Sequence, residues 1–163
     1  MLDGDEGTLG AALRHLARQA RAATVEAARA EYHALFIGVA RGELVPYASF
    51  YLTGFLHERP LARLRADMAR LGFALVPGRS DPEDHIASIL DVMASLIEEQ
   101  HAEEAAFFER HLANWAGRFF ADLERTQTAR LYRPIGELGR VLIELDRQGF
   151  ALADSASPQR GAA

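Results

Sequence analysis

Apolar residues recur with a helical period in almost every segment of this chain, and neither strand alternation nor an internal repeat is evident. Loops are predicted at residues 38–46 and 73–80, which hold helix-breaking Gly and Pro residues. The pattern predicts an all-α, single-domain bundle of about six helices over residues 1–150, with a disordered tail at 151–163. The clearest stripe places these residues on one helix face: Ile86, Ile89, Leu90, Met93, Leu96 and Ile97.

Four other segments carry apolar stripes of the same period. An Ala- and Arg-rich stretch begins after Thr8 and continues, as one helix or as two, towards Ile37. Residues 61–71 form a stripe that stops at Gly72, and residues 131–145 form the last one. The remaining stripe is aromatic, and we expect it to pack in the core; it comprises Phe107, Phe108, His111, Leu112, Trp115 and Phe119.

The residue types that are missing exclude several kinds of site. The chain has 163 residues, 49% of them hydrophobic, which is enough for the core of about one domain. It contains no Cys, which excludes a disulfide scaffold, a thiolate zinc site and a Cys nucleophile. All 18 basic residues are Arg, so no Lys is available for a Schiff base or a P-loop. The net charge of −5 disfavours nucleic acid and favours a basic peptide as partner.

Nothing in the sequence indicates membrane insertion or export. No apolar run approaches the roughly 20 residues that a bilayer span needs. The acidic first residues lack the charged-then-apolar layout of a signal peptide. We therefore expect a cytoplasmic protein without stable membrane insertion.

Motifs for catalysis or for cofactors are missing or incomplete. There is no Gly-x-Ser-x-Gly, Gly-x-Gly-x-x-Gly or Walker-type sequence. Glu98-x-x-His101 matches half of a di-iron carboxylate motif, but such a site needs two copies and two further Glu residues. We therefore predict that the chain is not an enzyme and holds neither a metal ion nor another cofactor. The alternative is a small helical metal-binding or di-iron-type protein that uses Glu98, His101 and Glu104.

The run from Asp81 to His85 has the composition of a helix start. Asp81 suits an N-cap and Pro82 the first helical position, and the two following acids suit the positive end of the helix dipole. His85 is not explained by this reading, because the dipole disfavours its cationic form. The same cluster offers acceptors and a switchable donor to a peptide or an anion.

Aromatic residues flank the predicted loop at 38–46. Tyr32 and Phe36 are four residues apart, and so are Tyr47 and Tyr51, with Ser49 between them. Such residues can pack two helices across a loop, with Ser49 as a local cap. They can also line an amphipathic groove, because Tyr combines an apolar ring with a polar tip.

Taken in order, four motifs resemble the TorD/DmsD/NarJ family of molybdoenzyme maturation chaperones. Each motif is weak alone, but together they cover residues 31–119. They are Tyr32-x-x-Leu35-Phe36-x-Gly38, Pro46-Tyr47-x-Ser49-x-Tyr51, Pro82-x-Asp84-His85 and Phe107-Phe108-x-x-His111-Leu112-x-x-Trp115-x-x-x-Phe119.

The resemblance implies an all-helical cytoplasmic chaperone for a molybdopterin oxidoreductase. It would bind the twin-arginine signal peptide and the apo catalytic subunit, and it would delay export until the cofactor is inserted. Carboxylates such as Glu83 and Asp84 suit the guanidinium groups of the leader, and an aromatic groove suits its apolar helix. The peptide-binding residues implied in this way are Tyr32, Phe36, Tyr47, Ser49, Tyr51, Pro82, Glu83, Asp84 and His85.

The chain departs from the family pattern at its N-terminus. Family members usually carry another helical hairpin before the Tyr32 motif, whereas only residues 1–31 precede it here. We expect this shortened N-terminal region to leave surface exposed, which favours a homodimer or a helix-exchanged dimer.

A third reading of the sequence, beside the chaperone and the metal-binding protein, is a structural helical module whose aromatic residues are all in the core.

Overall fold

The computed structural model describes residues 3–39, 41–74 and 81–156. Within these ranges the chain forms eight α-helices and one π-helix without a β-strand, which confirms the all-α prediction. The elements are α1 (Asp3–Ala22), α2 (Val25–Tyr32), η1 (His33–Ile37), α3 (Ala48–Thr53), α4 (Arg59–Arg70), α5 (Ile86–Glu98), α6 (Glu104–His111), α7 (Ala116–Arg125) and α8 (Tyr132–Ala156).

The helices outnumber the predicted six because two of the five predicted stripes are divided and α3 lies in a segment without a predicted stripe. The N-terminal stripe breaks at Thr24, whose hydroxyl accepts a hydrogen bond from the Ala27 N–H (3.1 Å) and so caps α2. The aromatic stripe breaks between α6 and α7. There the Trp115 indole N–H donates to the His111 carbonyl (2.7 Å), which a continuous helix would pair with the backbone N–H of residue 115.

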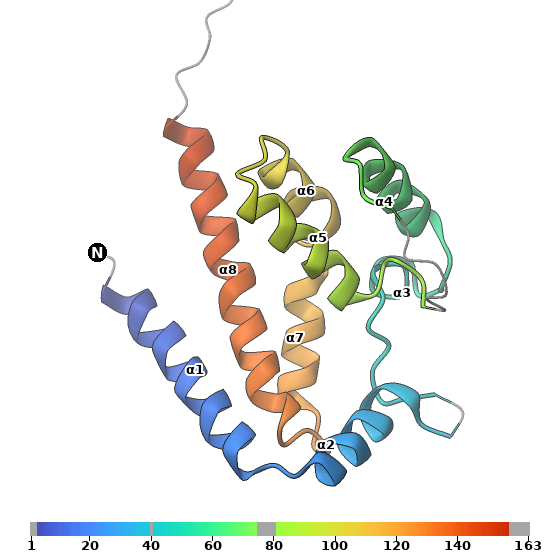
Figure 1. The fold of residues 1–163 in the computed structure, drawn as a ribbon, viewed down its shortest axis with the longest axis vertical. Coiled ribbons are helices and arrows are strands. Elements are labelled where there is room, and N and C mark those ends of the chain that lie inside the picture. The colour runs from blue at the N-terminus through green and yellow to red at the C-terminus, as the bar shows by residue number, and fades with distance from the viewer. Residues whose placement is uncertain (1–2, 40, 75–80, 157–163) are drawn as a thin grey trace, which may run out of the picture.

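Helix α8 is the central helix of one half of the molecule. Helices α1 and α7 pack along opposite sides of it, and both run antiparallel to it (Figure 1). Two glycines allow α7 to come close. A Cβ atom at Gly139 would lie 2.4 Å from the Phe120 ring, and one at Gly136 would lie 2.8 Å from the Glu124 backbone nitrogen. Side chains larger than hydrogen at these two positions would therefore push α7 and α8 apart.

The helices α3 to α6 form the other half, where α4 and α5 both contact α6. One continuous core joins the two halves, and its largest fully buried side chains include Trp115, Phe107 and Phe108. The aromatic stripe thus lies in the core, as the sequence predicts. None of the described helices is long and apolar enough to cross a membrane.

Helix α5 confirms the predicted apolar stripe but begins later than predicted. The prediction that Asp81 caps this helix and that Pro82 opens it is wrong. Residues 82–84 form a turn, and His85 is the N-cap. At the other end of the chain, α8 continues past the predicted start of the tail to Ala156. Residues 75–80 of the second predicted loop and residues 157–163 of the predicted tail lie outside the described ranges.

Candidate functional site: an apolar cavity where four motifs meet

Two short segments, residues 46–48 and 84–86, pair as an isolated antiparallel bridge. The Ala48 N–H donates to the Asp84 carbonyl, and the Ile86 N–H donates to the Pro46 carbonyl, both at 2.9 Å. The bridge places Tyr47 opposite His85. It therefore joins the second sequence motif to the third, although the two are far apart in the chain.

Asp84 stabilises this bridge through both its backbone and its side chain. Its side chain is fully buried, and one carboxylate oxygen accepts a hydrogen bond from the Ser49 N–H at 2.8 Å. Because Ser49 lies in the first turn of α3, Asp84 supplies the cap that this helix lacks locally. Its other oxygen and the Ser49 hydroxyl have no hydrogen-bond partner among the described residues. The Asp84 carboxylate is thus buried and bonded within the protein, and its expected contact with the leader stays a prediction.

His85 lies opposite Tyr47 in the same bridge and is partly buried. Its Nδ1 accepts the Ala87 N–H at 3.1 Å and thereby caps α5, so the neutral ring carries its proton on Nε2. The ring packs edge-on against Tyr47, with 5.1 Å between centroids. Burial raises the pKa of the Tyr47 hydroxyl, and the negative charges of Asp81 and Asp84 raise it further.

Next to His85 the structure holds an apolar cavity of about 250 Å³. One wall is a cluster of three rings from distant parts of the chain. The centroid of Phe36 lies 5.3 Å from that of Tyr32 and 5.4 Å from that of Tyr132. The cavity is lined by Tyr32, Phe36, Pro46, His85, Ile86, Ala87, Leu90, Phe119, Phe120, Leu123, Tyr132 and Ile135. Each of the four sequence motifs contributes at least one of these residues.

The structure thus brings Tyr32, Phe36 and His85 together, three of the nine residues implied by the resemblance, with Tyr47 beside them. It adds Tyr132 and Ile135 from α8, which the motifs do not cover. Tyr132 carried no signal in the sequence, because it lies outside the four motifs of residues 31–119. Pro46, Phe119 and Phe120 lay within or beside the motifs without being assigned to the site.

The remaining implied residues do not line the cavity. Pro82 lies in the turn before His85. Glu83 binds the Arg65 guanidinium at 2.7 Å. Burial would raise the pKa of Glu83, but the hydrogen bond and charge of Arg65 outweigh it and lower the pKa.

Tyr51 belongs to another part of the core. Its ring packs against Trp115 (5.6 Å) and Phe119 (5.8 Å), and its hydroxyl donates to Asp122 at 3.0 Å. Burial and the nearby Asp122 carboxylate raise the pKa of this hydroxyl. Tyr51 therefore supports Phe119, one wall of the cavity, from a position outside it.

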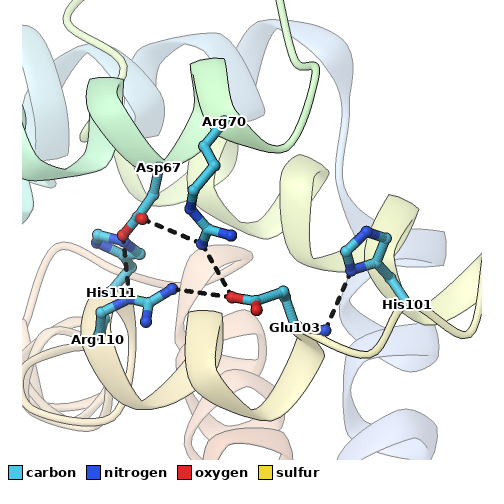
Figure 2. Close-up of polar contacts among 6 residues, drawn as sticks. All are labelled: Asp67, Arg70, His101, Glu103, Arg110 and His111. Carbon is cyan, nitrogen blue, oxygen red and sulfur yellow. Dashed lines mark hydrogen bonds and ion pairs between the residues drawn. The ribbon is translucent and has the colours of Figure 1, made fainter.

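The alternative metal site is not assembled. Among the described residues, no group of three or more His, Asp or Glu side chains is arranged to hold a metal ion. His101 instead accepts the Glu103 N–H through Nδ1 (3.1 Å), while Glu103 binds Arg70 and Arg110 (Figure 2). Residues 98–104 thus belong to the junction of α5 and α6, which is held by the His101 bond and by ion pairs from Glu103 to α4 and α6.

A larger, charged depression of about 530 Å³ lies between α3, α4 and α6, but none of the nine implied residues lines it. Its lining includes the buried His111, whose Nε2 lies 2.8 Å from a carboxylate oxygen of Asp67. Figure 2 draws both side chains. Burial lowers the pKa of His111 despite that neighbour. Burial would raise the pKa of Asp67, but hydrogen bonds from His111 and Arg70 and the charge of Arg110 lower it. This network ties α4 to α6, so we regard it as structural.

The described residues form an all-α fold in which distant motifs meet at an apolar recess. The family model described as nitrate reductase delta subunit matches residues 3–121. The chain therefore belongs to the nitrate reductase delta subunit family, which confirms its resemblance to the TorD/DmsD/NarJ proteins.

Several relatives carry the name chaperone protein TorD. The chain is 28% identical to that of Vibrio atlanticus over 75% of this chain and 63% of the relative. It is 32% identical to that of Vibrio vulnificus over 55% and 48%, and 27% identical to that of Vibrio cholerae over 88% and 73%. The chain thus spans between about half and two thirds of the length of the first two relatives.

Proposed function

We propose that this chain is a cytoplasmic, non-enzymatic maturation chaperone. Its partners would be the twin-arginine leader and the apo catalytic subunit of a molybdopterin oxidoreductase, which it would hold back from export until the cofactor is inserted. The observation that carries the proposal is the convergence of four separate motifs on one apolar cavity. The family membership and the chaperone names of the relatives support it.

In this proposal the cavity binds one large apolar side chain of the leader. Its volume of about 250 Å³ is smaller than that of pockets for whole drug-sized ligands, which measure about 300–1,000 Å³. Burying one Leu or Phe side chain contributes roughly 1.5–3 kcal/mol. Because the lining is apolar, the leader arginines would have to bind elsewhere.

The turn before His85, a residue that lines the cavity, carries several carboxylates. Asp81 is exposed and Glu83 is partly exposed, so we assign the contact with the leader arginines to these two residues. Because Glu83 is paired with Arg65, a leader arginine would have to share or replace that partner. Asp84 and Ser49, both buried, would act by holding the turn and α3 in place. The net charge of −5 would speed the encounter with a basic leader, and this effect would weaken with salt.

A titration with a labelled twin-arginine leader peptide tests the proposal. We expect binding that weakens at high salt and that falls about tenfold or more in Phe36→Ala, because the lost ring is worth at least about 1.4 kcal/mol. The matched control is Phe55→Ala, since Phe55 is 70% exposed and does not line the cavity. Equal affinity for a scrambled, uncharged peptide would refute the proposal.

A further inference from the structure

A carboxylate clamp fixes the start of α8. The side chain of Glu31, near the end of α2, accepts three backbone N–H groups at this point. They are those of Arg130 (2.7 Å), Leu131 (3.1 Å) and Tyr132 (2.8 Å). The first N–H groups of a helix have no partner within the helix, and a negative charge is favourable there. Glu31 therefore caps α8 from a position about a hundred residues earlier in the chain.

The Glu31 clamp links the two sides of the aromatic wall that Tyr32, Phe36 and Tyr132 form. Glu31 is adjacent in sequence to Tyr32 and lies about one helical turn before Phe36. Its carboxylate also accepts the backbone N–H of Tyr132. The Tyr32 and Tyr132 rings lie 6.3 Å apart, and all three rings line the apolar cavity. The carboxylate thus sets the distance between the two sides of that wall.

From this geometry we infer that Glu31 is a positioning residue for the cavity. By binding the start of α8, it holds Tyr132 against Tyr32 and Phe36 and so sets the width of the recess that receives the apolar side chain of a ligand. The inference rests on the proposed function for the identity of that ligand. It assigns Glu31 no contact with the ligand.

The conservative variant Glu31→Gln separates positioning from folding. An amide has a single acceptor oxygen and no charge, so it cannot reproduce three charge-assisted bonds, yet its size is unchanged. The matched control is Glu137→Gln. Glu137 is on α8 as well and pairs with His15 of α1 at 2.7 Å, but it does not line the cavity.

Four readouts at a temperature well below the melting transition test the inference, two of local structure and two of binding. In Glu31→Gln we expect weaker nuclear Overhauser effects between the Tyr32 and Tyr132 rings and faster amide exchange at residues 130–132. Affinity for a twin-arginine leader should fall about tenfold, equivalent to about 1.4 kcal/mol, and discrimination between Leu and Ala at the docked position should shrink. In Glu137→Gln, affinity should stay within about twofold even if the melting temperature drops.

Unchanged ring contacts, or unchanged leader affinity in a Glu31→Gln protein that melts at a lower temperature, would overturn the inference. A wild-type protein that binds no leader would instead refute the proposed function. In that case the ring contacts still decide whether Glu31 positions the wall.

Discussion

Substitution of Asp84 is the sharpest test of how this fold is held together. Asp84→Ala removes a buried, charge-assisted bond of 2.8 Å and leaves the Ser49 N–H without its acceptor. An unsatisfied buried donor costs about 1–3 kcal/mol, and a bond to a charged group contributes about 1.5–3 kcal/mol. Both ranges include part of the same lost hydrogen bond, so they cannot be added in full. We expect the free energy of unfolding to fall by about 2–4 kcal/mol. For a domain of this size that corresponds to roughly 4–16 °C in melting temperature.

The assay combines thermal melts and urea denaturation, followed by circular dichroism and by the fluorescence of Trp115, the one tryptophan in the chain. Asp84→Asn keeps one oxygen for the Ser49 N–H and removes a buried charge, so it should lie within about 1 kcal/mol of wild type. Asp81→Ala is the control for charge in the same turn. Because Asp81 is exposed, its loss should change stability by about 0.5 kcal/mol or less.

The refuting result is also specific. If Asp84→Ala melts like the wild type while leader binding is lost, Asp84 contacts the peptide directly, as the family resemblance implies. The cap that we assign to it would then contribute little to the stability of α3. Equal destabilisation by Asp84→Asn and Asp84→Ala would show that the charge, and not the acceptor, matters.

Two further predictions concern pH and association. The pKa of His111 is lowered in the folded state, so the unfolded chain takes up a proton first as the pH falls below the ordinary value of 6.5. The wild type should therefore lose more unfolding free energy than His111→Gln between pH 7.5 and 5.5, as measured by urea titration; an equal loss would contradict the assignment. We also propose that the exposed apolar residues Leu13 of α1 and Leu142 of α8 form a homodimer or helix-exchange surface. Leu13→Glu should then shift sedimentation towards the monomer, and a wild type that is monomeric at high concentration would refute this.

Local patterns predicted the helices that depend on local signals. The stripe from Ile86 to Ile97 became α5 because amphipathic periodicity lies within the segment itself. Its start was misplaced for a nonlocal reason. Asp84 looks like a first-turn acid of α5, but its side chain caps α3, and His85 takes over the cap of α5. The position of a carboxylate in the sequence, next to an apolar helix, does not show which helix its side chain caps.

The candidate site was predicted in part, for the same reason. Tyr32, Phe36 and His85 were found because their motifs are compact in sequence. Tyr132 was missed because its position is fixed by Glu31, which contacts it across about a hundred residues. The aromatic stripe was read as one helix because periodicity continues through the break at Trp115, whose indole bond is invisible in a pattern of apolar residues.

The caps that come from distant residues also constrain the order in which this chain can fold. Helix α3 is only six residues long, which is too short to be stable alone, and its acceptor lies 35 residues further along. The start of α8 is capped by the carboxylate of Glu31, about a hundred residues upstream. Loop-closure entropy must be overcome before either contact stabilises its helix. We therefore expect α5 and the α7–α8 hairpin to form early and the walls of the cavity to close last, so that the recess exists only in the completed fold.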